Sequence, residues 1–349
     1  MLYLDKRLII LICISIACRH LWIQNVEIYH QQKNTKSKQY DSFRNKQRKT
    51  NELKTNRPFL AFDTPRGKKE KQNFASSLSE ALVKVQDPVF ILYGNKGYKS
   101  IMGNFVCNMA LYPPIHKHIL MVVTDNTTAL FLQTLSEDIT LYVSQGEQNL
   151  HDAYNFESPE YLKLMLARGW MLVDLLREAV VQKRTVIWLE PDFYYTQNLL
   201  NRTEMMETVS DLVLFWDQEM YCGCFIRFAP VQASVLFYKE VMQRMQAIHS
   251  KGGTTNDQIL LNAVVADQLP NFTLFDRCLY RSGTFNTGGY MLEYQLSCLG
   301  IQPVAQHHNW IVGAGTKVQM AKEKGGWFMT EDEQRCKTNV THQGLESFT

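Results

Sequence analysis

The chain has 349 residues, of which 45% are hydrophobic and 20% charged, with a formal net charge of +3. This is the composition of a globular protein, and it excludes a chain that is disordered throughout. The charge is unevenly distributed, because residues 30–75 alone carry +9 and residues 1–29 carry +1, which leaves −7 for residues 76–349. A basic tail of this kind can be a nucleic-acid-binding arm. Because its aromatic residues are few and scattered, we favour a solvated spacer and expect no nucleic-acid partner.

The N-terminus has the features of a membrane anchor. Lys6 and Arg7 precede an apolar run over 8–18, which is interrupted by two polar residues and resumes at 21–23. A membrane-spanning helix needs about 20 apolar residues, and no small-residue cleavage site follows the run. We therefore expect an uncleaved signal anchor over residues 1–23 and a basic, flexible stem over residues 24–84.

Two further patterns favour a lumenal location for the rest of the chain. Four Asn-x-Ser/Thr sequons offer glycosylation sites, at Asn126, Asn201, Asn271 and Asn339. Six of the eight cysteines lie outside the anchor and could pair as disulfides in an oxidising compartment, namely Cys107, Cys222, Cys224, Cys278, Cys298 and Cys336. Zinc is disfavoured, since Cys222-Gly-Cys224 lacks the two to four residues that separate paired zinc ligands.

Apolar runs and helix-like stretches alternate along the chain from about residue 85. Short apolar runs predict buried strands at 89–93, 118–123, 139–143 and 185–189. Between them, helical patterns cover 99–112, 127–135 and 158–182. This alternation predicts an α/β fold with a mostly parallel central sheet over residues 85–330, followed by a C-terminal tail over 331–349. Such sheets bind ligands beyond the carboxyl ends of their strands.

The strongest candidate site follows the predicted strand at 185–189. Glu190 and Asp192 leave its carboxyl end two residues apart, so in an extended chain their side chains point the same way. Two carboxylates there suit Mg²⁺ or Mn²⁺, although a solvated acidic pair is the simpler interpretation. Further along, His307 could complete a metal shell, Lys317 could neutralise phosphate, and Gly313 would let backbone amides approach a diphosphate.

Two other motifs are ambiguous when taken alone. Asp257 and Gln258 follow Thr and Asn residues that suit a helix N-cap, so they either begin an ordinary helix or line a pocket at its start. The run Cys222-Gly-Cys224-Phe225 is strand-like, and it either packs in the core or forms a wall where the backbone approaches a sugar closely.

In this order and spacing, the motifs resemble those of the nucleotide-diphospho-sugar transferase domain family. This family includes plant rhamnogalacturonan-II xylosyltransferases and invertebrate proteins that resemble UDP-xylose:fucose xylosyltransferases. Its pattern is a strand ending in Asp-x-Asp, then Cys-Gly-Gly-Phe, an Asp-Gln pair, and His-x-Asn-Trp-x-x-Gly with a following Lys. The chain matches the last of these with His307-x-Asn309-Trp310-x-x-Gly313 and Lys317. It departs twice, with Glu190 in place of the first Asp and Cys224 in place of the second Gly.

The resemblance implies a GT-A fold, a UDP-sugar donor, a divalent cation (Mn²⁺ or Mg²⁺) and transfer with retention of configuration. It assigns Asp192 and His307 as metal ligands, with Glu190 facing the metal or the nucleotide ribose. Asp257 and Gln258 would line the donor-sugar pocket as catalytic residues, and Lys317 would hold the diphosphate. Gly313 and Arg168 are further candidates for contacting the donor, although Arg168 could equally lie on a solvated helix face.

We therefore expect a retaining glycosyltransferase, anchored as a single-pass type II protein in the Golgi membrane with its catalytic domain in the lumen. It would move xylose or galactose from a UDP-sugar to a glycan or glycoprotein acceptor. The two departures from the family pattern motivate one alternative, a catalytically inactive, lectin-like pseudoglycosyltransferase. The residues do not decide between a carboxylate nucleophile and attack by the acceptor on the departing face.

Overall fold

The computed structural model describes residues 74–144, 150, 152–154, 158–206, 209–217, 220–268, 270–283, 296–308 and 313–337. All of them belong to one compact unit, Lys71–Thr349. The expected anchor, most of the expected stem and the sequon at Asn339 lie outside the described residues. Within the part described, no helix combines the length and apolar character needed to cross a membrane.

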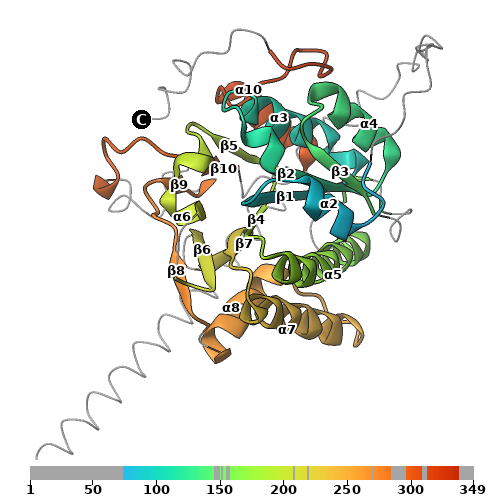
Figure 1. Cartoon of the computed structure of the whole chain (residues 1–349), viewed down its shortest axis with the longest axis vertical. Coiled ribbons are helices and arrows are strands. Elements are labelled where there is room, and N and C mark those ends of the chain that lie inside the picture. The colour runs from blue at the N-terminus through green and yellow to red at the C-terminus, as the bar shows by residue number, and fades with distance from the viewer. Residues whose placement is uncertain are drawn as a thin grey trace, which may run out of the picture. The chain divides into compact units, whose positions relative to one another are not determined.

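The central sheet has seven strands in the order β3-β2-β1-β4-β7-β6-β8 (Figure 1). The strands are β1 (Val89–Gly94), β2 (Ile119–Val123), β3 (Thr140–Val143), β4 (Val186–Leu189), β6 (Leu212–Asp217), β7 (Met220–Phe228) and β8 (Phe272–Leu274). The first four pair in parallel, as does β8 with β6, whereas β7 runs antiparallel to both of its neighbours. The predicted mostly parallel α/β sheet is thus confirmed, and its four predicted strands lie within a residue of their expected bounds.

Helices cover both faces of this sheet, so the side chains of β1, β2 and β4 are buried throughout. Figure 1 shows α5, α7 and α8 on one side of the sheet and α3 and α4 on the other. The helices are α2 (Leu78–Lys84), α3 (Lys99–Met109), α4 (Asn126–Leu135), α5 (Pro159–Gln182), α6 (Thr203–Met206), α7 (Gln232–His249), α8 (Asp257–Gln268) and α10 (Ala314–Glu323), with short 3₁₀ turns η1 (Lys96–Tyr98), η2 (Ile115–His118) and η3 (Leu199–Asn201).

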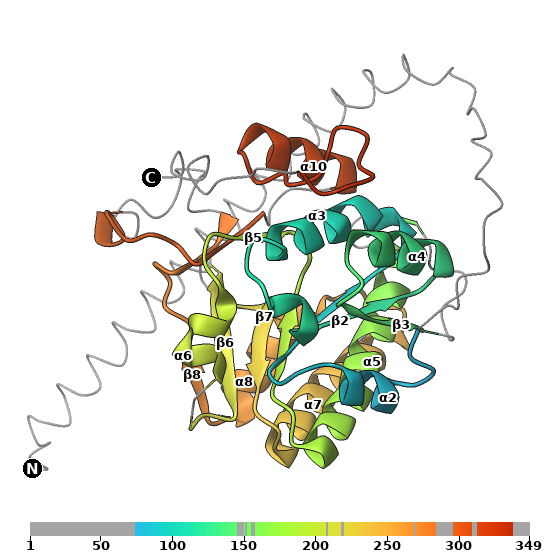
Figure 2. The ribbon, with the colours of Figure 1, turned by 45° about the horizontal axis from the view of Figure 1, so that its top comes forward.

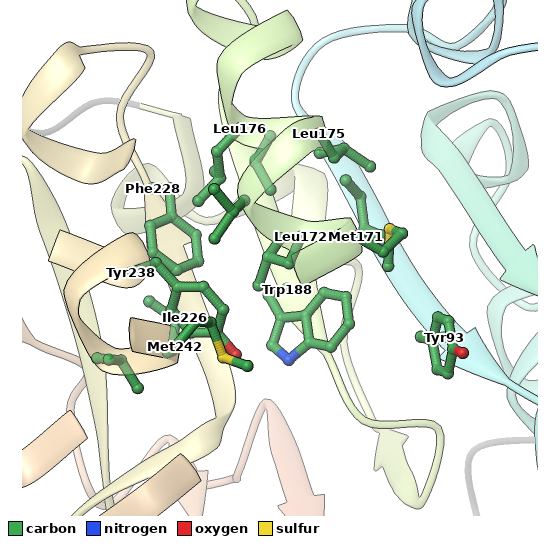
Figure 3. Packing of buried hydrophobic residues seen from close by; sticks show 14 of the residues in the cluster. Tyr93, Met171, Leu172, Leu175, Leu176, Trp188, Ile226, Phe228, Tyr238 and Met242 are labelled. Carbon is green, nitrogen blue, oxygen red and sulfur yellow. The ribbon is translucent and has the colours of Figure 1, made fainter. Parts of the chain in front are cut away.

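Trp188 is the largest fully buried side chain of the larger hydrophobic core cluster. Its side chain is about 1% exposed and lies between α5 and α7, among the apolar side chains of Leu172, Ile226 and Met242 (Figure 3). Burying an aromatic ring of this size contributes a few kcal/mol of hydrophobic free energy, roughly 3 kcal/mol or more. Because Trp188 is in β4, this packing holds the strand that leads into the candidate site.

A second, smaller sheet has the order β5-β10-β9, from Phe193–Tyr195, Ala305–His307 and Tyr280–Arg281. β10 pairs antiparallel with β5, in a register that puts His307 opposite Phe193. None of these three strands was predicted, because each has at most three residues and its partners are distant in sequence. His307 therefore lies beside Phe193, the residue that follows Asp192.

The described fold extends beyond both boundaries that we expected. Helix α2 lies within the predicted stem, yet it buries Ala81 and Leu82 in the larger core. At the other end, Trp327, Phe328 and Met329 pack with Tyr194 and Ala321 in a third cluster. Figures 1 and 2 show the adjoining helix α10 alongside α3. The first part of the expected tail joins this cluster, because Cys336 is bonded to Cys107 and the Lys337 backbone nitrogen donates to the Phe328 carbonyl at 2.8 Å.

All six cysteines outside the expected anchor form disulfides, as predicted. The pairs are Cys107–Cys336, Cys222–Cys224 and Cys278–Cys298. The first joins α3 to the C-terminal segment across a separation of 229 residues. A cross-link that closes so long a loop restricts the unfolded chain strongly, and this stabilises the folded state.

The turn after β1 is held tightly against the segment before α5. The Asn95 side chain donates hydrogen bonds to the carbonyls of Leu150 and Asp152, both at 2.8 Å. Gly97 lies so close to this segment that an added Cβ would be 2.0 Å from the backbone nitrogen of Ala153. Only glycine fits at this position without a shift of the backbone.

We therefore expect Gly97→Ala to lower the free energy of unfolding by about 2 kcal/mol or more, since the clash is with backbone atoms. Urea denaturation followed by circular dichroism measures this change. Gly315→Ala is the matched control, because Gly315 is in α10 with open space around it. That control should be neutral or gain about 0.5 kcal/mol, and equal effects of the two substitutions would contradict the close approach.

Candidate metal and nucleotide-sugar site

The carboxyl ends of β1 and β4 meet at one edge of the central sheet, because the two strands are parallel neighbours. β1 leads into the turn at Asn95–Tyr98, and β4 leads into Glu190-Pro-Asp192. β7 runs the opposite way, and its Cys224 carbonyl accepts a hydrogen bond of 2.9 Å from the Glu190 backbone nitrogen. This edge is where an α/β sheet binds its ligands.

Glu190, Asp192 and His307 form the centre of the site. Nε2 of His307 lies 3.1 Å from Oδ1 of Asp192 and 3.6 Å from Oε2 of Glu190. The His307 ring stacks face to face on Phe193, with ring centroids 4.0 Å apart. The stacking and the pairing of β10 with β5 together fix the imidazole beside both carboxylates.

Lys317 completes this half of the site from helix α10. Its Nζ donates a hydrogen bond to Oδ2 of Asp192, so the two side chains form an ion pair. Gly313 precedes the helix with a φ of 91°, a conformation that favours glycine, and its carbonyl accepts a hydrogen bond from the Lys317 backbone nitrogen. Gly313 thus sets the start of the helix turn that carries Lys317. The residues between His307 and this turn, Asn309 and Trp310 among them, lie outside the described residues.

Arg168 links Glu190 to the other predicted residues. It is buried on α5, where it donates to Oε1 of Glu190 at 2.9 Å and to Oδ2 of Asp257 at 2.6 Å. Its guanidinium also lies 5.5 Å from the centre of the Trp188 ring. Arg168 therefore belongs to the site and does not lie on a solvated helix face.

Asp257 and Gln258 begin helix α8. Asp257 accepts a hydrogen bond of 3.0 Å from the Gln258 backbone nitrogen at Oδ1, while its Oδ2 accepts from Arg168. Gln258 is half-buried beside it in the first turn. The structure thus brings together all the sequence-predicted site residues within one connected region, whereas their individual roles remain proposals.

Opposite charges determine how these groups ionise. Burial raises the pKa of Glu190, but the hydrogen bond from His307 and the charge of Arg168 outweigh burial and lower that pKa to about 2. Burial also raises the pKa of Asp192, but the neighbouring Lys317 and His307 outweigh burial and hold that pKa well below its usual range. For His307, burial lowers the pKa, but the two carboxylates outweigh it and raise the pKa to about 9.

The run Cys222-Gly-Cys224-Phe225 forms one wall of the site. The pairing of β6 with β7 is irregular here, since Leu214 is opposite Ile226 while Phe215 is opposite Cys222. A bulge of this kind re-aims side chains, and the two cysteines and Phe225 all lie in the core cluster on the α3 side of the sheet. Gly223 faces the other way, where an added Cβ would be 3.5 Å from Oδ2 of Asp257.

Two residues near the site were not predicted. Tyr98 is in η1, beyond the carboxyl end of β1, and its pKa is raised by burial and also responds to the charges of Lys317 and Asp192. The rule that ligands bind beyond strand ends could have singled it out. Phe193, which supports His307, offered no signal beyond its position next to Asp192.

The donor atoms of Glu190, Asp192 and His307 suit a divalent cation. One atom from each residue lies within 4.8 Å of the other two. Two carboxylate oxygens and one imidazole nitrogen are ligands that Mn²⁺ accepts readily. Beside this cluster, Asp192, His308, Lys317 and Trp327 line a hollow of about 10 Å³, which has room for about one water molecule. It does not hold a whole nucleotide sugar.

Several solved glycosyltransferase structures are similar to this chain. The apo structure of the bifunctional glycosyltransferase WbbM shares 11% identity, over 67% of this chain and 49% of that chain, with a TM-score of 0.47. GlyE of Streptococcus pneumoniae TIGR4 shares 13%, over 70% of this chain and 66% of that chain, with a TM-score of 0.43. The galactosyltransferase LgtC, in complex with donor and acceptor sugar analogs, shares 10%, over 70% of this chain and 98% of that chain, with a TM-score of 0.46. This chain thus spans about half the length of the WbbM chain and about two thirds of the GlyE chain.

No curated protein sequence matches the chain. A family model does, over residues 114–320, which is more than half of the chain and includes β4, β7, α8 and the His307–Lys317 region. The chain belongs to the nucleotide-diphospho-sugar transferase family.

Proposed function

We propose that the protein is a metal-dependent UDP-sugar glycosyltransferase. The observation that carries this proposal is the cluster of Glu190, Asp192 and His307 at the carboxyl end of β4, with donor atoms within 4.8 Å of one another. Family membership supplies the reaction class, because the family uses nucleotide-diphospho-sugar donors. The site also offers a lysine beside a carboxylate, which suits a ligand with phosphate charge.

A divalent cation held by these three residues would act as a Lewis acid for the departing diphosphate. The chain's own cations would assist it. Without ligand, Lys317 forms an ion pair with Asp192. When the donor binds, Lys317 would exchange that carboxylate for a donor phosphate oxygen. Such a preorganised positive charge stabilises negative charge that accumulates on the leaving group.

The contacts of Asp257 favour a positioning role over a nucleophilic one. One of its oxygens accepts from Arg168 and the other from the Gln258 backbone nitrogen. A carboxylate engaged at both oxygens is a weak nucleophile, because each hydrogen bond stabilises its charge. We therefore propose that Asp257 and Arg168 shape the donor-sugar pocket and that the acceptor hydroxyl attacks on the departing face, which retains configuration.

The finer assignments extend this proposal. We propose xylose or galactose as the donor sugar and a glycan or glycoprotein as the acceptor, on the resemblance given by the motifs. We further propose a lumenal Golgi location with the N-terminus as the anchor. Three disulfides among the described residues support an oxidising compartment, and Asn126, Asn201 and Asn271 are all exposed for glycosylation.

Turnover should depend on Asp192. In a panel of UDP-sugars with Mn²⁺, we expect UDP release from one sugar, abolished by a chelator and lowered at least about 100-fold in kcat/KM by Asp192→Asn. Asp174→Asn is the matched control, because Asp174 is exposed on α5, and it should keep full activity.

Asp257→Asn should keep measurable turnover if Asp257 positions Arg168, whereas complete loss with unchanged folding would favour a nucleophile.

Binding without turnover would have a different meaning. If the folded protein binds UDP with Mn²⁺ but releases none from any UDP-sugar, even with glycan acceptors present, the pseudoglycosyltransferase becomes the better description. If it binds neither UDP nor Mn²⁺, the proposed function is wrong.

Metal affinity should rise with pH. Since the pKa of His307 is raised to about 9, the imidazole carries a proton at neutral pH that a cation must displace. The apparent dissociation constant for Mn²⁺, measured by electron paramagnetic resonance, should fall about tenfold per pH unit between pH 6 and 8. His307→Gln has no such proton and should bind more weakly with a flat profile. A flat profile for the wild type would show that the proton is absent.

Passage through the lumen has a direct test. Protein secreted from a eukaryotic host should lose mass on treatment with an N-glycosidase, and Asn→Gln at each of Asn126, Asn201 and Asn271 should remove one increment. Secretion without any such loss would contradict the proposed compartment.

A further inference from the structure

The wall formed by Cys222 and Cys224 contains a second set of metal-binding atoms. Their side chains are buried, with 3% and 2% of each residue exposed. Both sulfurs and one ring nitrogen of His307 lie within 4.8 Å of one another. This set shares His307 with the carboxylate cluster but has none of its oxygens, so it would select a different kind of cation.

The fold brings these atoms together from two sheets. The bulge in β7 directs both cysteines into the same core cluster, and the pairing of β10 with β5 directs His307 toward them. The short spacing argues against a zinc site built from the local sequence, but the irregular register of β7 still places both sulfurs beside a nitrogen of His307.

His307 has one nitrogen to spare. Its Nε2 is engaged with Asp192 and Glu190, whereas its Nδ1 is buried and has no hydrogen-bond partner within the described residues. A buried polar atom without a partner is costly, so it needs an explanation. A metal ligand at Nδ1 would supply one.

We propose that Cys222, Cys224 and His307 form a site for a thiophilic cation, such as Cu⁺, Zn²⁺ or Cd²⁺, once the Cys222–Cys224 disulfide is reduced. A dithiol reductant gives the disulfide two electrons and two protons and becomes a disulfide itself. Cation binding then releases the two thiol protons. Two thiolates and one imidazole are the soft donors that such cations prefer.

The two sites compete for one imidazole. A neutral imidazole has a single nitrogen lone pair, because its other nitrogen carries the proton. A hard cation at Nε2 leaves the proton on Nδ1, whereas a thiophilic cation at Nδ1 leaves it on Nε2, where it can be donated to Asp192. Loading the thiolate site therefore leaves His307 no lone pair at Nε2 for a cation at Glu190 and Asp192, and this weakens the proposed Mn²⁺ site. This competition rests on the proposed function, but the thiolate site itself does not.

The test uses Cd²⁺ as the probe with the full chain purified from a secretory host. Protein treated with a dithiol or left untreated is desalted without oxygen and titrated with Cd²⁺, following the thiolate-to-cadmium absorption band and the bound metal. We expect the reduced wild type to bind about one equivalent more than Cys222→Ser/Cys224→Ser, and the unreduced wild type to lack this equivalent. The double variant keeps the other six cysteines of the full chain, so it accounts for any cadmium that they bind.

His307→Ala separates a built site from adventitious thiols. It keeps all the cysteines, so thiols exposed by reduction bind Cd²⁺ equally in it and in the wild type. We expect it to bind Cd²⁺ at least about tenfold more weakly at the thiolate site. Equal binding by His307→Ala and the wild type, whether or not reduction unfolds the chain, overturns the proposal. This readout involves no Mn²⁺ and no sugar donor, so its failure is distinct from a failure of the proposed function.

Discussion

Charge compensation beyond the end of β4 is the constraint on which the site depends. Three carboxylates are placed there with little exposure, and an isolated buried carboxylate is expensive to ionise. Arg168 lies between Glu190 and Asp257, while Lys317 and His307 contact Asp192. Three acids and three cations thus form a network that is neutral at neutral pH. Removing any one member leaves the network with one uncompensated charge.

The scaffold holds this network rigid through parts that carry no charge. β4 is fixed by Trp188 in the larger core, and Arg168 reaches Glu190 from a helix that packs over that same ring. His307 is fixed by Phe193, whose ring it stacks on. Arg168 and His307 are therefore each held by an aromatic neighbour and Lys317 by a helix turn, and preorganisation of this kind is what electrostatic catalysis requires.

The sequence predicted the central sheet well because its signals are local. Runs such as 89–93 and 185–189 are continuous and apolar, and helix 158–182 has Ser158 as its N-cap and a proline in its first turn. β5, β9 and β10 were missed because three residues cannot show a period, and β5 pairs with a strand more than a hundred residues away. For the site, the residues themselves indicated Glu190 and Asp192 only weakly. It was the resemblance, and not any local pattern, that joined them to His307 and Lys317.

Some features of the site follow from three-dimensional packing and could not be read from the sequence. A single arginine shared between Glu190 and Asp257 requires α5, β4 and the start of α8 to meet. The bulge at Cys222-Gly-Cys224 is likewise a product of the mismatched register of β6 and β7. It sends the cysteines toward His307 and Gly223 toward Asp257.

The charges also show how the resting network would accommodate a ligand. In the absence of ligand, the Lys317 ammonium and the His307 proton neutralise Asp192. A divalent cation bound to Glu190, Asp192 and His307 would replace both, and it would release Lys317 for the diphosphate. The positive charges of metal and lysine would then meet the negative charge of the donor at one place, so each partner would make the binding of the other more favourable. In this view Lys317 and the His307 proton keep the carboxylates compensated in the absence of ligand, and their displacement couples metal binding to donor binding.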